Sequence, residues 1–302
     1  MMATGQVVRS AGELRELLAA ARMREMTVGF VPTMGALHAG HQALIERSTA
    51  ENDLTVVSVF VNPAQFDDAA DLDSYPRREE TDVELAFGAG ADICFLPSVR
   101  EIYPAGHATT VSMAGTVTEV LEGAERGSGH FDGVCTVLTI LFSIVGPDST
   151  FFGTKDAQQL AVVRRLVRDL GLGIRVEGVP TVREADGLAM SSRNARLGVE
   201  DREAALALSR ALAGAGRSIL EGTATTASEI EAAGIAALAR GGAEPEYFAA
   251  VDAESFETDQ HPNGETLLLC AARVGNVRLI DNMTAAEAAE TGYGFDRERE
   301  ES

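Results

Sequence analysis

The sequence is short of the residues from which disulfide frameworks, zinc sites and membrane spans are built. Its three cysteines, Cys94, Cys135 and Cys270, are far apart and lie in apolar surroundings. This spacing favours core residues over half-cystines or zinc ligands. The most apolar run, Val134 to Val145, is interrupted by polar residues and is too short to cross a bilayer. It predicts a buried helix.

Positive charge is also scarce. The chain has 46 Asp and Glu against 25 Lys and Arg, a formal net charge of −21 at pH 7. Such a field repels DNA, RNA and anionic membrane surfaces, so we expect neither a nucleic acid nor a membrane as partner. An anionic substrate would need a few locally placed cations and backbone N–H groups.

The first residues lack the order of a signal peptide, and Ser10 and Glu13 are spaced as a capping box opening a helix from Leu14 to Met23. We therefore expect a cytoplasmic protein.

Short apolar runs alternate with helical patterns from Thr27 to Val179, which is the signature of a parallel sheet built from βαβ units. The predicted strands are Val28–Pro32, Leu54–Val61, Ile93–Leu96, Ser149–Phe152 and Ile174–Val179. The predicted helices between them are His41–Ala50, Glu79–Phe87, Val134–Val145 and Ala157–Leu170. Ligands of such sheets bind beyond the carboxyl ends of the strands, where the strand order reverses. We expect an α/β fold over residues 1–180.

The composition changes after Leu197. Ala-rich helices are predicted first, and strands follow them: Glu200–Glu221, Ala227–Arg240, then Tyr247–Val251, Leu267–Arg273 and Val277–Ile280. Gly275 and Asn276 would turn the last two strands into a hairpin. This pattern predicts a smaller α+β domain over residues 181–283. Residues 284–302 are acidic and lack apolar periodicity, which predicts a disordered tail.

A phosphate-binding turn is predicted where the strand at Val28 meets its helix. The segment Pro32–His41 reads PTMGALHAGH, in which Gly35 and Gly40 allow close backbone approach and the helix start offers free N–H groups. His38 and His41 would stabilise charge on a transferring phosphate. Taken alone, the pair fits capping or core histidines equally well. A zinc pair lacks a third ligand nearby in the sequence.

Lysine occurs once, at Lys155, and the other 24 basic residues (25 minus 1) are arginines. A compact ammonium kept at one position points to a role that a guanidinium does not fill. Lys155 lies in FFGTKD, just past a predicted strand and at a helix start, so we expect it to contact phosphate. Chance retention is the alternative.

Two further segments carry polar groups of a suitable kind. Met190–Asn194 reads MSSRN, whose hydroxyls and guanidinium can hold polyphosphate oxygens, although a solvated linker would look the same. Asn62 and Gln65 follow the apolar strand at Leu54, and their amides suit a small hydroxy acid. A plain turn is the alternative there.

Together these segments resemble the pantothenate synthetase family from about Val28 to Met283. The resemblance rests on five motifs in order: PTMGALHAGH, VFVNPAQF, DSYPR, FFGTKD followed by Gln158 and Gln159, and PTVREADGLAMSSRN. It implies a Rossmann-like nucleotidyltransferase domain, a smaller C-terminal domain that covers the site, and a homodimer. It also implies an AMP-forming ligase that joins (R)-pantoate to β-alanine through a pantoyl adenylate, with ATP as co-substrate and Mg²⁺ as metal.

The resemblance also implies a role for individual residues. Those implied for ATP are Met34, Gly35, Ala36, Leu37, His38, Ala39, Gly40, His41, Gly153, Thr154, Lys155, Asp156, Val182, Met190, Ser191, Ser192 and Arg193. Those implied for pantoate and β-alanine are Gln65, Gln159, Asn62 and Met34. Catalysis falls to His41, His38 and Lys155, and Asp82 is the expected magnesium ligand. The sequence departs from the family pattern at Thr154, at Ala157 and in a longer segment from Arg126 to Phe131, so Arg126 and His130 stay unassigned.

The chemistry suits these residues. A carboxylate is a poor acyl donor, so its oxygen would first attack the α-phosphorus of ATP, and the amine would then displace AMP. No Ser or Cys stands in a nucleophile setting, and none is required. Two other hypotheses stay open at this point. Another adenylyl- or cytidylyltransferase would not form an amide, and a non-catalytic adenylate sensor would bind ATP without exchanging pyrophosphate.

Overall fold

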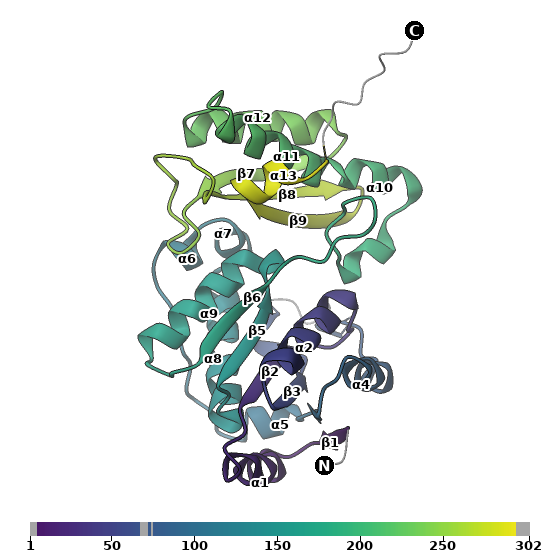
Figure 1. Ribbon diagram of the computed structural model, residues 1–302, viewed down its shortest axis with the longest axis vertical. Coiled ribbons are helices and arrows are strands. Elements are labelled where there is room, and N and C mark those ends of the chain that lie inside the picture. Colours follow the sequence, from purple (N-terminus) through teal and green to yellow (C-terminus); the bar gives the residue numbers. More distant parts are fainter. Residues whose placement is uncertain (1–4, 67–71, 74, 294–302) are drawn as a thin grey trace. The chain divides into compact units, whose positions relative to one another are not determined.

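The computed structural model describes residues 5–66, 72–73 and 75–293. The chain divides into two compact units, Met1–Pro180 and Thr181–Ser302. In Figure 1 the first unit is coloured from purple to teal and the second from green to yellow.

The first unit is built on a six-stranded sheet in which every pairing is parallel. The strands are β1 (Gln6–Val8), β2 (Val28–Thr33), β3 (Leu54–Val59), β4 (Ile93–Phe95), β5 (Ser149–Gly153) and β6 (Arg175–Val179). Their order across the sheet is β1-β4-β3-β2-β5-β6. The predicted α/β class is confirmed. The sequence pattern missed β1, whose three residues are too few to show a periodicity.

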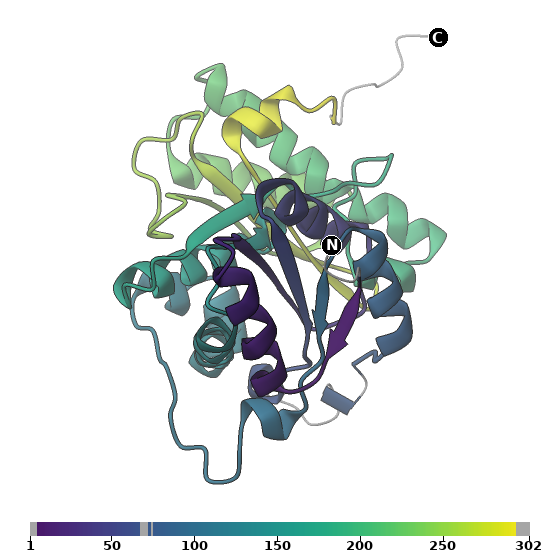
Figure 2. The same ribbon diagram turned by 60° about the horizontal axis from the view of Figure 1, so that its bottom comes forward.

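Helices cover both faces of this sheet. They are α1 (Ala11–Arg22), α2 (Ala39–Glu51), α4 (Glu79–Gly88), α5 (Val99–Ile102), α6 (Thr116–Glu119), α7 (Glu122–Arg126), α8 (Ser128–Val145) and α9 (Ala157–Asp169). Helices α2 and α4 pack on one face, and α8 contacts both α1 and α9 on the other. Figure 2 shows α1 and α4 on opposite sides of the sheet. Because both faces are covered, nearly every residue of the central strands β2 and β3 is buried, and buried residues do not alternate with exposed ones. Phe30 and Phe151 are fully buried in the sheet, and each contributes about 1.5–3 kcal/mol through burial.

The strand order reverses between β2 and β5. The chain runs from β2 to β3 and β4 on one side, then returns to place β5 and β6 on the other side of β2. Segments that leave the carboxyl ends of β3, β2 and β5 therefore start at one edge of the sheet. These are the segments that begin NPAQ, PTMGALHAGH and GTKD.

The second unit pairs helices with a small antiparallel sheet. Its elements are η3 (Ser192–Arg196), α10 (Val199–Ala205), α11 (Ala207–Leu220), α12 (Ala227–Arg240), β7 (Glu244–Val251), β8 (Leu267–Val274), β9 (Val277–Thr284) and α13 (Ala285–Glu290). The strands lie in the order β7-β8-β9. The expected hairpin is present, and Gly275 turns it with φ +54°. The helix predicted from Glu200 to Glu221 is two helices, which break at Leu206.

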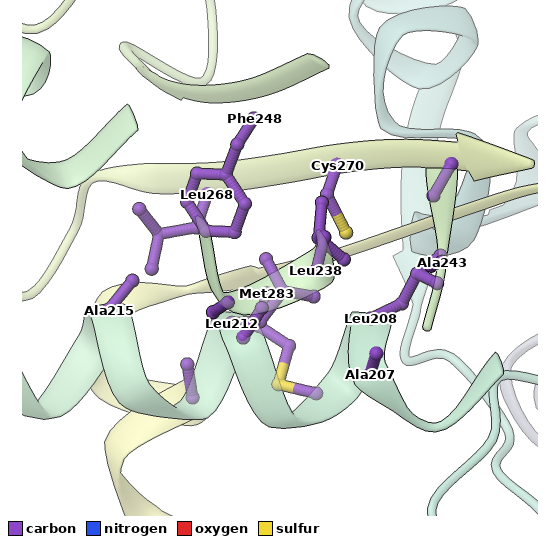
Figure 3. Packing of buried hydrophobic residues seen from close by; sticks show 14 of the residues in the cluster. Ala207, Leu208, Leu212, Ala215, Leu238, Ala243, Phe248, Leu268, Cys270 and Met283 are labelled. Atoms are coloured by element: carbon purple, nitrogen blue, oxygen red, sulfur yellow. The ribbon is translucent and has the colours of Figure 1, made fainter. Parts of the chain in front are cut away.

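The core of this unit forms between the helices and the sheet. Figure 3 shows Leu208 and Leu212 of α11 directed at Leu268 and Cys270 of β8. Small residues let these layers approach closely. A Cβ at Gly234 of α12, for example, would come within 2.2 Å of the Phe248 ring. All three cysteines are free and buried, as the sequence predicts.

The tail is shorter than predicted. Thr284 caps α13 through a capping box with Glu287, and Ala285 and Ala288 are fully buried. The prediction of disorder from residue 284 is therefore wrong for residues 285–290. The prediction failed because the acidic composition gave no sign of the short helix α13, which packs against α11. Residues 294–302 lie outside the described part of the chain. Among the residues that the structure describes, none of the helices has both the length and the apolarity to span a bilayer.

Candidate functional site

Two histidines cap helix α2 at the point where the chain leaves β2. His38 is the N-cap residue, and its Nδ1 accepts a hydrogen bond from the N–H of Gly40 at 3.1 Å. The Nδ1 of His41 accepts one from the N–H of His38 at 3.3 Å. The ring centroids are 4.2 Å apart. The two histidines therefore cap the helix, as one interpretation of the sequence expected, and this capping role is compatible with the predicted role at a phosphate.

These bonds fix the tautomer of both rings. A backbone N–H can only donate, so each Nδ1 must carry a lone pair, and the proton of a neutral ring must sit on Nε2. Burial lowers the pKa of His38, the charge of Lys155 lowers it further, and Asp156 opposes both effects. Burial, followed by repulsion from His38, lowers the pKa of His41 to about 4. At neutral pH the turn presents two uncharged imidazoles, each with an Nε2–H donor.

The low pKa of His41 predicts a loss of stability on acidification. Its pKa falls from the ordinary 6.5 to about 4 on folding, so between these values the unfolded chain binds more protons than the folded one. Neutral His41 makes its full contribution to the free energy of unfolding above pH 6.5. As the pH falls from 6.5 to 4, this contribution decreases by roughly 3 kcal/mol. Urea unfolding at pH 7 and pH 4.5 should show a smaller pH dependence in His41→Asn than in the wild type. An equal dependence in the two proteins would contradict this assignment.

Asp82 holds the backbone of the histidine turn. It is 2% exposed, and its Oδ2 and Oδ1 accept hydrogen bonds from the N–H groups of Ala36 at 3.0 Å and Leu37 at 2.8 Å. Gly35 and Ala36 both have positive φ, +85° and +52°. A Cβ at Gly35 would come within 2.9 Å of Asp82 Oδ2. Asp82 therefore stabilises an unusual backbone turn through one hydrogen bond to each carboxylate oxygen, and its role as a magnesium ligand stays a prediction.

Lys155 and Asp156 lie beside this turn. Strand β5 pairs with β2 through Phe30 and Thr150, and Gly153 ends β5 immediately before a 3₁₀ turn, η2 (Thr154–Asp156). The charges of Lys155 and Asp156 both act on His38. The structure thus brings together four residues from two segments more than a hundred positions apart, as predicted for the carboxyl edge of the sheet.

The neighbouring glutamines of α9 have different surroundings. Gln158 is 3% exposed. Its Nε2 donates to the carbonyls of Val117 and Val120, and its Oε1 accepts from the N–H of Glu122. It ties the α6–α7 segment to α9. Gln159 is only partly buried, which is consistent with the expectation that it, and not Gln158, contacts substrate.

Asn62 is bonded entirely within the protein. It is 1% exposed, and its amide makes four hydrogen bonds within the protein: to Ala64, Gly133, Gln65 and Tyr103. An amide with all four positions used has none left for a ligand. Asn62 therefore supports Gln65, which is partly buried and closer to solvent. Tyr103 went unnoticed in the sequence because it lies in no motif.

The segment left unassigned in the sequence also packs in the first unit. Arg126 donates to Glu122 at 3.2 Å. His130 is 9% exposed, and its Nδ1 lies 3.2 Å from the carbonyl oxygen of Gln65. Helices α7 and α8 of this segment meet at Gly127, which has φ +75°.

The segment from Thr181 to Asn194 is an ordered loop of the second unit, not a solvated linker. Arg183 makes a bidentate ion pair with buried Asp281, at 2.7 and 2.9 Å. The N–H of Met190 donates to the carbonyl of Val182 at 2.9 Å, and Ser191 caps the 3₁₀ helix η3 by accepting from the N–H of Arg193. Val182, Met190, Ser191, Ser192 and Arg193 are thus held on one internally bonded loop.

Comparisons with known proteins identify the family to which this chain is similar. The family described as Pantoate-beta-alanine ligase matches residues 6–284. Pantothenate synthetases of Rhizorhabdus wittichii and Moorella thermoacetica are 49% and 46% identical to the chain, over 94% and 92% of its length and 99% and 98% of theirs. A solved pantothenate synthetase from Thermus thermophilus has a TM-score of 0.84 and 45% identity, covering 93% of this chain and 99% of that one.

A further solved structure extends the comparison. The pantoate-beta-alanine ligase of Francisella tularensis, in complex with β,γ ATP and β-alanine, has a TM-score of 0.73 and 30% identity, covering 93% of this chain and 98% of that one. The resemblance seen in the motifs is confirmed. The chain belongs to the pantoate-beta-alanine ligase family.

Proposed function

We propose that the residues gathered at this edge of the sheet join pantoate to β-alanine through a pantoyl adenylate, with release of AMP and pyrophosphate. Family membership supports the overall reaction. The observation that carries the residue assignments is the meeting of two neutral histidines and the single lysine at the point where the strand order reverses. The complex of the Francisella relative with ATP and β-alanine supports the choice of co-substrates.

In the first half-reaction a carboxylate oxygen of pantoate attacks the α-phosphorus of ATP, and pyrophosphate leaves. Negative charge grows on the phosphoryl oxygens and on the leaving group, so a cation and preorganised donors placed there lower the barrier. Lys155 supplies the cation. His38 and His41 supply Nε2–H donors and give up no proton, because each ring is neutral and its Nδ1 is held by the backbone.

In the second half-reaction the amine of β-alanine attacks the acyl carbon and AMP departs, which closes the amide. Gln65 and Gln159 hold the acid in place. No enzyme nucleophile takes part, which agrees with the state of the thiols: burial raises the pKa of Cys94 and Cys135 to about 12. A buried, protonated thiol is unreactive.

Magnesium is proposed to bind mainly through the phosphate oxygens of ATP. Within the described ranges, no group of three or more His, Cys, Asp or Glu side chains could hold a metal ion. Mg²⁺ needs few protein carboxylates when a polyphosphate supplies its ligands, and Asp156, exposed beside the histidines, is the candidate here. When bound, the ion would neutralise charge on the departing pyrophosphate.

The resemblance to the family also supports a role in ATP binding for five residues of the ordered loop. Met190, Ser191, Ser192 and Arg193 are proposed to contact the phosphates, and Val182 the nucleotide. A homodimer in the cytoplasm completes the proposal, and both of these expectations rest on the resemblance to the family.

Exchange of labelled pyrophosphate into ATP tests the first half-reaction. With magnesium, exchange should require pantoate and should not be supported by β-alanine alone. Exchange without any acid would point to a different adenylyltransferase. Confirmed ATP binding with no exchange would indicate a nucleotide sensor and would overturn the proposal.

Asp82 offers a separate test of how the turn is held. In Asp82→Asn the amide NH₂ faces a backbone donor, so one buried N–H loses its partner at a cost of about 1–3 kcal/mol. We expect exchange to fall at least tenfold while the magnesium concentration for half-maximal rate stays unchanged. Asp92→Asn is the matched control, because Asp92 accepts a backbone N–H of β3 away from the turn. A raised magnesium requirement in Asp82→Asn alone would restore Asp82 as a metal ligand.

A further inference from the structure

A chain of hydrogen bonds leads from the partly buried Tyr103 through the buried Asn62 to the partly buried Gln65. The Tyr103 hydroxyl donates to Asn62 Oδ1 at 2.8 Å. Asn62 Nδ2 donates to Gln65 Oε1 at 3.0 Å. Asn62 lies just after β3 and caps the short 3₁₀ helix η1 (Pro63–Gln65), so this chain ends among the segments that form the candidate site.

The backbone determines which way the Asn62 amide faces. The N–H of Ala64 donates to Oδ1 at 3.2 Å, and the carbonyl of Gly133 accepts from Nδ2 at 3.1 Å. A backbone N–H can only donate and a carbonyl can only accept. In a reversed amide, Nδ2 would face the Ala64 N–H, which is also a donor, and Oδ1 would face the Gly133 carbonyl, which is also an acceptor. Gly133 makes this arrangement possible, because a Cβ there would come within 2.2 Å of the Ala64 carbonyl oxygen.

The orientation of Asn62 in turn determines that of Gln65. The second hydrogen on Asn62 Nδ2 needs an acceptor, and the only acceptor of a glutamine side chain is Oε1. Gln65 must therefore turn Oε1 inward, and its Nε2, with two N–H donors, faces away from Asn62. Towards a ligand, Gln65 acts as a donor.

Tyr103 completes the network from the other side. Its ring packs edge-on against His107, with centroids 5.0 Å apart, and lies 6.2 Å from the Phe60 ring. Burial raises the pKa of its hydroxyl to about 12, although the bond to Asn62 opposes this. The group is thus protonated at every working pH and donates to Asn62 Oδ1, which supplements the Ala64 bond.

We propose that Tyr103 and Asn62 are positioning residues that fix the polarity of the Gln65 amide, so that Gln65 binds an oxygen of the hydroxy acid as a hydrogen-bond donor. This inference rests on the proposed function of Gln65. The ligand chemistry follows directly: a carboxylate or hydroxyl oxygen is accepted, and a group that only donates is rejected.

The test separates affinity for the acid from affinity for ATP. Tyr103→Phe removes only the hydroxyl, and we expect it to raise KM for pantoate about five- to tenfold, with KM for ATP within about twofold. Asn62→Asp replaces the NH₂ with oxygen, so Gln65 must turn its own NH₂ inward and offer Oε1 to the acid. We expect KM for pantoate to rise at least about a hundredfold in that variant. Tyr247→Phe, which removes a tyrosine hydroxyl from β7, is the control and should leave both constants unchanged.

The outcomes are distinct. A wild-type protein without pantoate-dependent pyrophosphate exchange would overturn the proposed function itself. An active wild type with an unchanged KM for pantoate in Tyr103→Phe would overturn the positioning role. So would a loss of kcat without any change in KM, or an equal rise in KM for both substrates, because general loosening of the fold would produce either. Thermal unfolding of each variant identifies proteins that have lost their fold, and Tyr103→Phe decides the outcome if Asn62→Asp does not fold.

Discussion

Replacing Lys155 by alanine is expected to reduce pantoate-dependent pyrophosphate exchange about a thousandfold. The ammonium is the cation brought to the histidine turn by β5, and removal of one preorganised charge-stabilising group typically costs a factor of about 10²–10³. An ion that also neutralises a leaving pyrophosphate belongs at the upper end of that range. The measurement is the exchange rate at saturating ATP, magnesium and pantoate.

Two controls define this result. Lys155→Arg keeps the charge but spreads it over a planar fork, so we expect intermediate activity. Arg165→Ala removes an exposed cation from α9 that pairs with Asp169 on the surface, and its rate should stay within about twofold of the wild type. Equal losses in Arg165→Ala and Lys155→Ala would show that the chain's general charge, and not the position of Lys155, sets the rate.

Replacing His41 has the second largest expected effect. His41→Ala removes an Nε2–H donor and half of the cap on α2, and we expect a loss of about 10²–10³ in exchange. His41→Gln keeps a neutral N–H donor near the same place, so it should retain clearly more activity than the alanine variant.

The pH profile decides between a neutral donor and a proton-transferring acid at His41. Because its pKa lies near 4, the wild-type rate should show no loss between pH 6.5 and 8 that His41→Gln lacks, and should fall only as pH approaches 4. An imidazolium that donates its proton would lose activity as pH rises through 6.5. A wild-type decline over that range, absent from His41→Gln, would contradict the neutral assignment.

The sequence predicted the parts of the fold that depend on local pattern. The buried strands at Val28 and Leu54 are apolar runs bounded by turns, and α9 repeats its apolar positions with helical spacing, so a single window reveals them. The β8–β9 hairpin was equally local, because Gly275 marks the turn. Strand β1 and helix α13 were missed because each is too short for periodicity, and both are stabilised mainly by what they pack against.

The candidate site also has residues that local motifs identify and residues whose roles depend on distant partners. The motifs name His38, His41, Lys155 and Gln65 because their chemistry can be recognised one segment at a time. The roles of Asp82, Asn62 and Tyr103 could not be predicted, since each depends on a partner tens of residues away. Asp82, the expected metal ligand, accepts two backbone N–H groups of the turn. Asn62, an expected substrate contact, makes four hydrogen bonds within the protein.

The sequence by itself determined the family, the fold class and the residue types able to handle an acid and a polyphosphate. Only the tertiary structure decided which polar groups are left for a ligand. A polar side chain is available only if no buried backbone or side-chain group already uses its donors and acceptors, and that depends on contacts between distant parts of the chain. For the same reason a linear motif does not record the low pKa of His41, which results from burial and from repulsion by His38.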